Sequence, residues 1–108
     1  MTGDRIATFQ QLLAANPDDA FARYGLAMEY RRLGNPQMAL EEFDRLREHQ
    51  PGYTAGYQMA AQLLMERGDV SGARERLQQG IACAQAENNT RAAREMHGML
   101  EEAEGYAE

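Results

Sequence analysis

Few residues of this chain have the types and spacing that catalysis or metal binding requires. The two histidines, His49 and His97, fall in different predicted helices, and no third ligand is arranged around either of them. We expect both to be surface or helix-end residues. Cys83 is the single cysteine, so it can form neither an internal disulfide nor a two-thiolate zinc site. Its alanine-rich surroundings predict packing as a small apolar residue, and we expect no metal site.

One stretch of mixed charges gathers several acidic side chains that acid–base chemistry could use. The stretch contains Glu41, Glu42, Asp44 and Glu48, interleaved with Arg45 and Arg47. At helical spacing Glu41 attracts Arg45 while Asp44 repels Glu48, a pattern typical of a solvated helix face. Phosphate-binding, zinc-protease and nucleophile-elbow motifs are missing from the sequence. We therefore predict that the chain is not an enzyme and takes no cofactor.

Composition narrows the class of protein further. With 108 residues, 44% hydrophobic and 26% charged, the chain has the size and mixture of one soluble globular domain. Its formal net charge of -6 argues against nucleic-acid binding, which needs a basic surface. The chain has 11 arginines and no lysine, which excludes lysine-dependent chemistry. The start lacks the apolar run of a secretory signal and no stretch could span a bilayer, so we expect a cytoplasmic protein without membrane contact.

The sequence repeats itself at a spacing of 34 residues, which points to a repeat fold. Phe9, Phe43 and Leu77 occupy equivalent positions, and so do Gly34 and Gly68. Apolar residues on either side of each glycine recur at helical spacing. Each glycine suits the position just after a helix end, and the asparagine or aspartate that follows it can cap the next helix. The repeating unit is therefore predicted to be a helix, a short turn and a second helix.

The predicted organisation is a single domain with four parts. Residues 3–16 form a half-repeat helix, 20–53 the first repeat, 54–87 the second repeat, and 89–106 a capping helix. Two residues are inserted before the last helix, because Met96 aligns with Ala60 at a spacing of 36. The last helix keeps one polar face, as the exposed end of a solenoid requires; that face carries Arg91, Arg94, Glu95, Glu101, Glu102 and Glu104.

These residues resemble the tetratricopeptide repeat (TPR) family, in particular small bacterial TPR proteins. The first unit carries the family pattern as Leu26-Ala27, Tyr30, Gly34, Ala39, Phe43 and Pro51, and the second as Tyr57, Ala60-Ala61, Leu64, Gly68, Ala73 and Leu77. Arg23 departs from the pattern, which usually has a large apolar residue there. Gln85 replaces the closing proline, so the second helix of that unit should run on longer. The resemblance implies an all-α fold, a right-handed α-α superhelix (TPR solenoid) of antiparallel helix pairs with a C-terminal capping helix.

The resemblance also implies a concave groove lined by the first helix of each pair, where the family binds peptides or partner surfaces. The family's groove positions correspond here to Phe21, Tyr24, Met28, Arg31 and Arg32 in the first unit, and to Ala55, Gln58, Gln62, Met65 and Glu66 in the second. In the alternative interpretation, Phe21, Tyr24 and Met28 pack against the preceding helix. Arg31 and Arg32 are then solvated charges near a helix C-terminus, where the helix dipole favours cations.

Two further expectations concern single positions. Some family members bind chaperone tails through a carboxylate clamp of lysine and asparagine, but those positions hold Tyr24, Met28, Gln58 and Gln62 here. We therefore predict no chaperone-tail binding of that kind. Gly25 lies in the middle of a helix, where glycine costs about 1 kcal/mol relative to alanine. Either a neighbouring backbone approaches it closely or it opens room in the groove floor, and we expect close helix packing.

The predicted function is that of a protein–protein interaction module, an adaptor or scaffold that binds a peptide or partner surface in the groove. The alternative is a self-association module, because so few units leave exposed ends that a homodimer could cover. Such a dimer could form through the concave face or end to end through the first helix. An enzyme is the remote alternative, since no polar constellation supports one.

Overall fold

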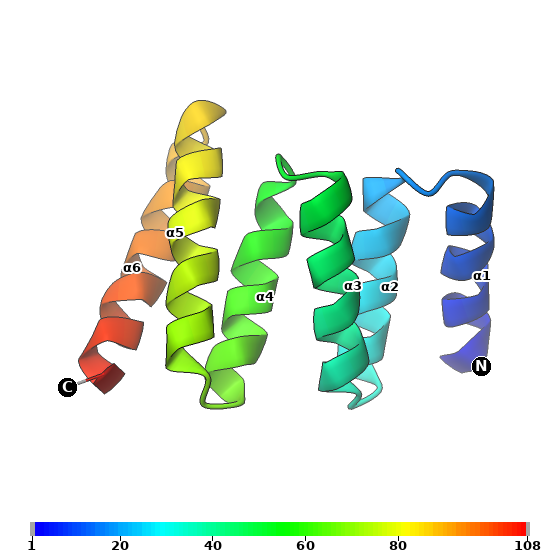
Figure 1. Cartoon of the computed structure of the whole chain (residues 1–108), viewed down its shortest axis with the longest axis horizontal. Helices are drawn as coiled ribbons and strands as arrows, with labels where there is room; N and C mark the ends of the chain where they lie inside the picture. The colour runs from blue at the N-terminus through cyan, green and yellow to red at the C-terminus, as the bar shows by residue number, and fades with distance from the viewer. Residues whose placement is uncertain (1, 108) are drawn as a thin grey trace. The chain divides into compact units, whose positions relative to one another are not determined.

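The computed structural model describes the backbone of residues 2–107 and the side chains of residues 5–105, and this part of the chain is entirely helical and irregular, without strands (Figure 1). The prediction of an all-α fold is confirmed. The helices are α1 (Thr2–Ala15), α2 (Ala20–Arg32), α3 (Pro36–His49), α4 (Thr54–Glu66), α5 (Val70–Ala86) and α6 (Thr90–Ala107). Within this part, none of the helices has both the length and the apolar character needed to cross a membrane.

Capping side chains explain where several helices begin. Asp19 and Asp69 precede α2 and α5, and their carboxylates accept hydrogen bonds from the backbone N–H of Ala22 at 3.0 Å and of Gly72 at 2.9 Å. Asn35 precedes α3, and Pro36 occupies the first turn of that helix, where its missing N–H costs nothing. The caps that the sequence predicted at Asn35 and Asp69 are confirmed.

The turns between paired helices need glycine. Gly34 and Gly68 have φ angles of 77° and 80°, a left-handed conformation that glycine adopts without steric cost. Before α6 the same conformation falls to Asn88, with φ of 58°, and the side chain of Asn89 then accepts a hydrogen bond from the N–H of Ala92 at 3.1 Å. Asn88 and Asn89 thus supply the turn and the cap from which α6 begins.

The helix lengths also agree with the departures from the family pattern. Helix α5 has 17 residues where α3 has 14, as expected from Gln85 in place of a closing proline. Met96 of α6 is fully buried and lies against Gly80, so the helix presents the side that the two-residue insertion predicted. The acidic and basic side chains predicted for its polar face are exposed.

Contacts divide the chain into two compact units, residues 1–51 and residues 52–108. In the first unit α2 packs against both α1 and α3. Leu26, Phe43 and Leu46 are buried there, and the ring of Tyr24 meets that of Phe43 edge-on, with centroids 6.2 Å apart. The predicted division into one domain with repeat boundaries at 53 and 87 stays a prediction.

Close packing of α1 on α2 depends on Gly25. A Cβ atom at this position would lie 2.5 Å from the ring of Phe9, well inside van der Waals contact. Glycine therefore lets the aromatic ring of α1 rest directly on the backbone of α2. The expectation that Gly25 permits a close approach is confirmed.

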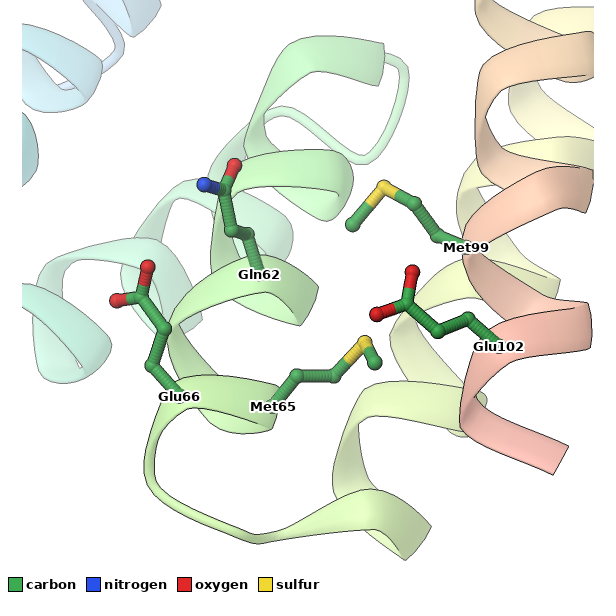
Figure 2. A pocket seen from close by; sticks show the side chains of 5 residues that line it. All are labelled: Gln62, Met65, Glu66, Met99 and Glu102. Carbon is green, nitrogen blue, oxygen red and sulfur yellow. The ribbon is translucent and has the colours of Figure 1, made fainter. Parts of the chain in front are cut away.

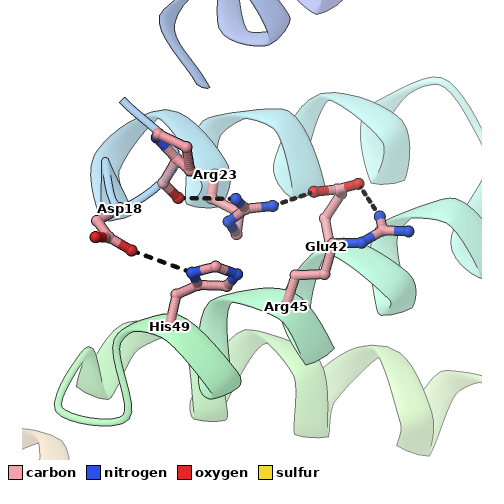
Figure 3. A network of polar contacts seen from close by, with 6 residues as sticks. Asp18, Arg23, Glu42, Arg45 and His49 are labelled. Carbon is pink, nitrogen blue, oxygen red and sulfur yellow. Dashed lines mark hydrogen bonds and ion pairs between the residues drawn. The ribbon is translucent and has the colours of Figure 1, made fainter. Parts of the chain in front are cut away.

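The first unit also contains a buried ionic network, which corrects one prediction (Figure 3). Glu42 is only 6% exposed, so it is not part of a solvated face. Arg23, at 8% exposure, donates to Glu42 at 3.2 Å and to the Pro17 carbonyl at 2.9 Å. Arg45, which the i, i+4 pattern placed beside Glu41, donates to the other oxygen of Glu42. Arg23, the residue that departs from the TPR pattern, is thus the ion-pair partner that allows Glu42 to be buried.

In the second unit α5 packs between α4 and α6. Its core is a cluster of Ala61, Ala73, Leu77, Ile81, Ala84, Ala93 and Met96, with Leu64, Met65, Ala92, Met99 and Leu100 packed around it. Gly80 keeps the helices close, since a Cβ there would lie 2.6 Å from the Met96 sulfur and 2.8 Å from Tyr57 Cβ. Helix α6 therefore completes the core of this unit.

The histidine and cysteine side chains, which could have taken part in catalysis or metal binding, make structural contacts or lie at the surface. His49 Nδ1 lies 3.1 Å from an Asp18 carboxylate oxygen at the surface, and His97 is exposed, as predicted. Cys83 is half-buried and not simply a packed apolar residue, because Thr54 Oγ1 donates to its Sγ at 3.2 Å and Glu87 lies 3.8 Å from it. The polar ends of α4 and α5 meet there, which the alanine-rich sequence did not indicate. Among the described residues, no three metal-ligating side chains gather.

Candidate functional site

A cavity of about 440 Å³ lies between α4 and α6 in the second unit (Figure 2). Gln62, Met65 and Glu66 of α4 line one side of it, and Met99 and Glu102 of α6 line the other. Three of the residues predicted to line a groove therefore lie together around one cavity. Its volume falls in the range of sites that hold a small ligand or a few side chains.

Helical spacing explains why these side chains share a cavity. Gln62, Met65 and Glu66 are three and four positions apart, so they project from one face of α4. Met99 and Glu102 are three apart on α6 and do the same. Ala61 and Met96, one turn before Met65 and Met99 on the same helices, belong to the core cluster formed with α5. The core thus fixes which faces of α4 and α6 are turned toward the cavity.

The apolar part of the lining comes from two thioethers. Figure 2 shows Met65 extending from α4 toward α6 and Met99 extending from α6 toward α4. Both residues are half-buried and also pack against the core cluster. The cavity floor is therefore continuous with the core, while Gln62, Glu66 and Glu102 are exposed beside it. Unbranched methionine side chains can change rotamer to fit different guests.

One predicted groove residue, Gln58, joins the two helices. Its side-chain amide donates to Glu95 of α6 at 3.1 Å, and Arg91 donates to the other oxygen of Glu95 at 3.1 Å. These hydrogen bonds, from Gln58 first and then from Arg91, outweigh desolvation and lower the pKa of Glu95. Gln58 therefore holds α4 to α6 beside the cavity and is not among the residues that line it.

The predicted site residues of the first unit lie on α2. Phe21 is 71% exposed, while Tyr24, Met28 and Arg31 are half-buried. Tyr24 is partly a core residue through its ring contact with Phe43 of α3, whereas the alternative interpretation expected packing against the preceding helix. Phe21 is the one apolar member of this set that is mostly exposed to solvent.

Arg32 is exposed but engaged. Its Nε donates to Glu29 at 3.2 Å, its Nη2 also contacts that carboxylate, and Arg5 of α1 lies 3.6 Å from it. Glu29 is 4% exposed, and the hydrogen bonds and charge of Arg32 lower its pKa despite this burial. In return the carboxylate raises the pKa of Arg32. Arg32 therefore neutralises a buried acid.

Sequence reasoning missed the α6 side of the cavity. Glu102 follows Glu66 at a spacing of 36, the same spacing that relates Met96 to Ala60, so the alignment could have identified it. Met99 is three positions from Met96, which the sequence places on the apolar side of the last helix, and its role at the cavity depends on how α6 is rotated against α4. That rotation is fixed by packing on α5.

Helix pairs that recur every 34 residues, with a cavity between successive first helices, define a helical-repeat protein. A tetratricopeptide repeat model matches residues 30–97, and a second one matches residues 8–41. The first covers more than half of the chain, which therefore belongs to the tetratricopeptide repeat family. The resemblance seen in the sequence is confirmed.

Individual relatives agree with this family. A TPR repeat-containing protein of Pseudomonas aeruginosa is 33% identical over 91 residues, which cover 84% of this chain and 87% of that protein. The solution structure of a tetratricopeptide repeat domain protein from Salinibacter ruber is 31% identical, covers 83% of this chain and 91% of that one, and has a TM-score of 0.79. PcrH, in complex with the chaperone binding region of PopD, has a TM-score of 0.90 at 23% identity, with 99% of this chain and 81% of PcrH covered. The likeness to PcrH concerns the fold alone.

Proposed function

We propose that this chain is a non-catalytic protein-interaction module, an adaptor that binds a peptide or partner surface on the first helices of its repeats. The observation that carries the proposal is the cavity between α4 and α6, into which Met65 and Met99 extend from opposite sides. A cavity with an adaptable apolar floor and polar rim suits a side chain of a bound segment.

The comparisons support a binding role. PcrH, which shares the fold, forms a complex with the chaperone binding region of PopD. A partner held in the present chain would use apolar contact with the thioethers and hydrogen bonds to the amide of Gln62. The formal net charge of -6 further supports a protein partner over a nucleic acid.

In the first unit we assign the same role to the exposed face of α2. Phe21 is the anchor there, because an aromatic ring at 71% exposure has area to bury on binding. Tyr24, Met28, Arg31 and Arg32 complete this part of the proposed surface. Since the chain contains no lysine and Gln58 is engaged with Glu95, we further propose that no carboxylate clamp for chaperone tails operates here.

The test is comparative capture of partners from an extract of the native host, quantified by mass spectrometry. We expect Met65→Ala/Met99→Ala to retain at least tenfold less partner than the wild type, because the apolar floor is lost. Met38→Ala, which removes a half-buried thioether of α3, is the matched control and should capture normally. Helicity by circular dichroism must be kept in both variants. Undiminished capture by the Met65/Met99 variant would contradict the assignment of the cavity.

Self-association is the second candidate, favoured by exposed apolar side chains in the first unit. Leu12 of α1 is 43% exposed and Phe21 of α2 is 71% exposed. Size-exclusion chromatography with light scattering separates the two functions. A dimer in which Tyr24 and Met28 become protected supports self-association, and a monomer over the micromolar range supports the adaptor.

A further inference from the structure

The charges around the cavity indicate what kind of guest fits it. Both charged residues of its lining, Glu66 of α4 and Glu102 of α6, are carboxylates, and none of the described lining residues is basic. The apolar part of the lining consists of the thioethers of Met65 and Met99, with the amide of Gln62 beside them. A matching guest must therefore present both apolar surface and positive charge.

Other guests match the lining less well. An anionic side chain would be repelled by the two carboxylates. A wholly apolar side chain would contact the thioethers but would make no charge interaction with the exposed carboxylates beside them. An arginine has a three-carbon stem that can lie along the thioethers and a guanidinium that can donate two parallel hydrogen bonds to a carboxylate. Its planar fork suits this recognition better than the point charge of lysine.

The surroundings of the cavity favour the same guest. Glu66 and Glu102 already take part in interactions within the chain, so an incoming guanidinium would add to or exchange with these. Helix α6 carries three more exposed glutamates, Glu95, Glu101 and Glu104, against two arginines. One of the two arginines, Arg91, forms an ion pair with Glu95. The net negative charge of this helix raises the local concentration of a cationic segment.

We infer that the cavity between α4 and α6 binds an arginine side chain from a partner peptide, with its stem between Met65 and Met99, its guanidinium at Glu102, and Glu66 adding negative charge on the α4 side of the rim. This inference rests on the proposed function and specifies the chemistry of the partner. It predicts that bound segments are recognised by a basic residue next to apolar ones.

Selection of a displayed random peptide library on the full chain tests the inference without a known partner. Wild type is compared with Glu66→Gln/Glu102→Gln, and with Glu101→Gln/Glu104→Gln, which removes the same charge from exposed positions outside the cavity lining. Peptides enriched on the wild type should contain arginine well above its frequency in the library. This enrichment should fall only slightly on the Glu101/Glu104 control, which keeps both carboxylates of the lining, and should disappear on the Glu66/Glu102 variant.

One enriched peptide is then made with arginine or with citrulline, its neutral isostere, and titrated against chain labelled at the methionine methyl groups. The arginine peptide should shift the Met65 and Met99 methyl resonances, which are assigned with Met65→Leu and Met99→Leu. The citrulline peptide should bind the wild type about tenfold more weakly than the arginine peptide does. The arginine peptide should likewise bind the Glu66/Glu102 variant about tenfold more weakly than it binds the wild type. Each loss is the combined effect of two partly exposed ion pairs.

The remaining outcomes distinguish a failure of the arginine inference from a failure of the proposed function. Enriched peptides without basic residues that still shift Met65 and Met99 would overturn the arginine inference and leave the proposed function standing. Peptides that bind without moving these methyl groups would overturn both the inference and the assignment of this cavity. No enrichment above an empty surface would contradict peptide binding itself. A wild-type dimer that dissociates in the Glu66/Glu102 variant would show that the guest is an arginine of a second copy.

Discussion

Arg23 lies where a TPR unit ordinarily places a large apolar side chain, and the first unit satisfies its charge from within. Its guanidinium reaches Glu42 of α3 and the carbonyl of Pro17, and Arg45 holds the other side of Glu42 (Figure 3). Burying ions costs several kcal/mol each, so such a network offsets that cost only while every partner is present. The side chain thereby fixes the loop before α2 and the pairing of α2 with α3.

The buried pair leads to a prediction about replacing it. Arg23→Leu alone should destabilise the protein by about 3 kcal/mol, because Glu42 stays buried with Arg45 as its remaining partner. Arg23→Leu/Glu42→Leu should recover to within about 1 kcal/mol of the wild type, since two apolar side chains then fill the site. Urea denaturation monitored by circular dichroism gives both values. A double variant as unstable as Arg23→Leu would show that the network cannot be replaced by apolar packing.

At the scale of elements, two interior glycines of helices differ in what surrounds them. Gly25 of α2 has the Phe9 ring of α1 against it, whereas a Cβ added at Gly98 of α6 meets nothing within 4 Å. Both glycines cost helix stability relative to alanine. Only Gly25 has a packing reason to be kept, so the two positions separate helix propensity from helix packing.

Alanine substitution should therefore change stability in opposite directions. Gly98→Ala should stabilise by roughly 0.5–1 kcal/mol, the gain in helix propensity. Gly25→Ala should instead destabilise by about 1–2 kcal/mol, because its methyl group displaces Phe9 from α2. In a Phe9→Ala background, Gly25→Ala should become stabilising, and a double-mutant cycle from thermal melts measures the coupling. Stabilisation by Gly25→Ala with Phe9 present would mean that the ring moves aside at no cost.

Local signals account for how much of the elements could be predicted from the sequence. Capping side chains at Asn35 and Asp69, with Gly34 and Gly68 before them, act over a few residues, so they indicated the helix limits closely. The burial of Glu42 depends on Arg23, a residue 19 positions away on another helix, and no local pattern contains that information.

The candidate site shows the same division. The α4 side of the cavity followed from the family pattern, because Gln62, Met65 and Glu66 lie on one face of a helix whose other face is apolar. The α6 side required the rotation of a second helix, which Met96 and Gly80 set by close packing. Met99 packs against the core cluster and also lines the cavity, and its spacing from Met96 indicates only the first of these roles.

At the scale of the whole molecule, acidic residues exceed basic ones, 17 to 11, and some of the acids are held ionised by specific partners. Hydrogen bonds from Arg32 lower the pKa of Glu29 in the first unit, and those from Gln58 and Arg91 lower the pKa of Glu95 in the second. For both groups the folded state binds a proton less readily than the unfolded state. Their contribution to stability is thus present above the ordinary glutamate pKa, about 4.3, and is lost as the pH falls through the lower folded values.

Acid should therefore weaken the fold through these two groups. We expect the melting temperature of the wild type to fall between about pH 5 and pH 3, where the unfolded state takes up more protons than the folded state. Glu29→Gln/Glu95→Gln should melt lower at pH 7 and lose less on acidification, so that the two curves converge at low pH. The control Glu101→Gln/Glu104→Gln removes equal charge from exposed positions and should keep the wild-type slope. Parallel curves for the wild type and the Glu29/Glu95 variant would show that these hydrogen-bonded carboxylates contribute nothing to acid sensitivity.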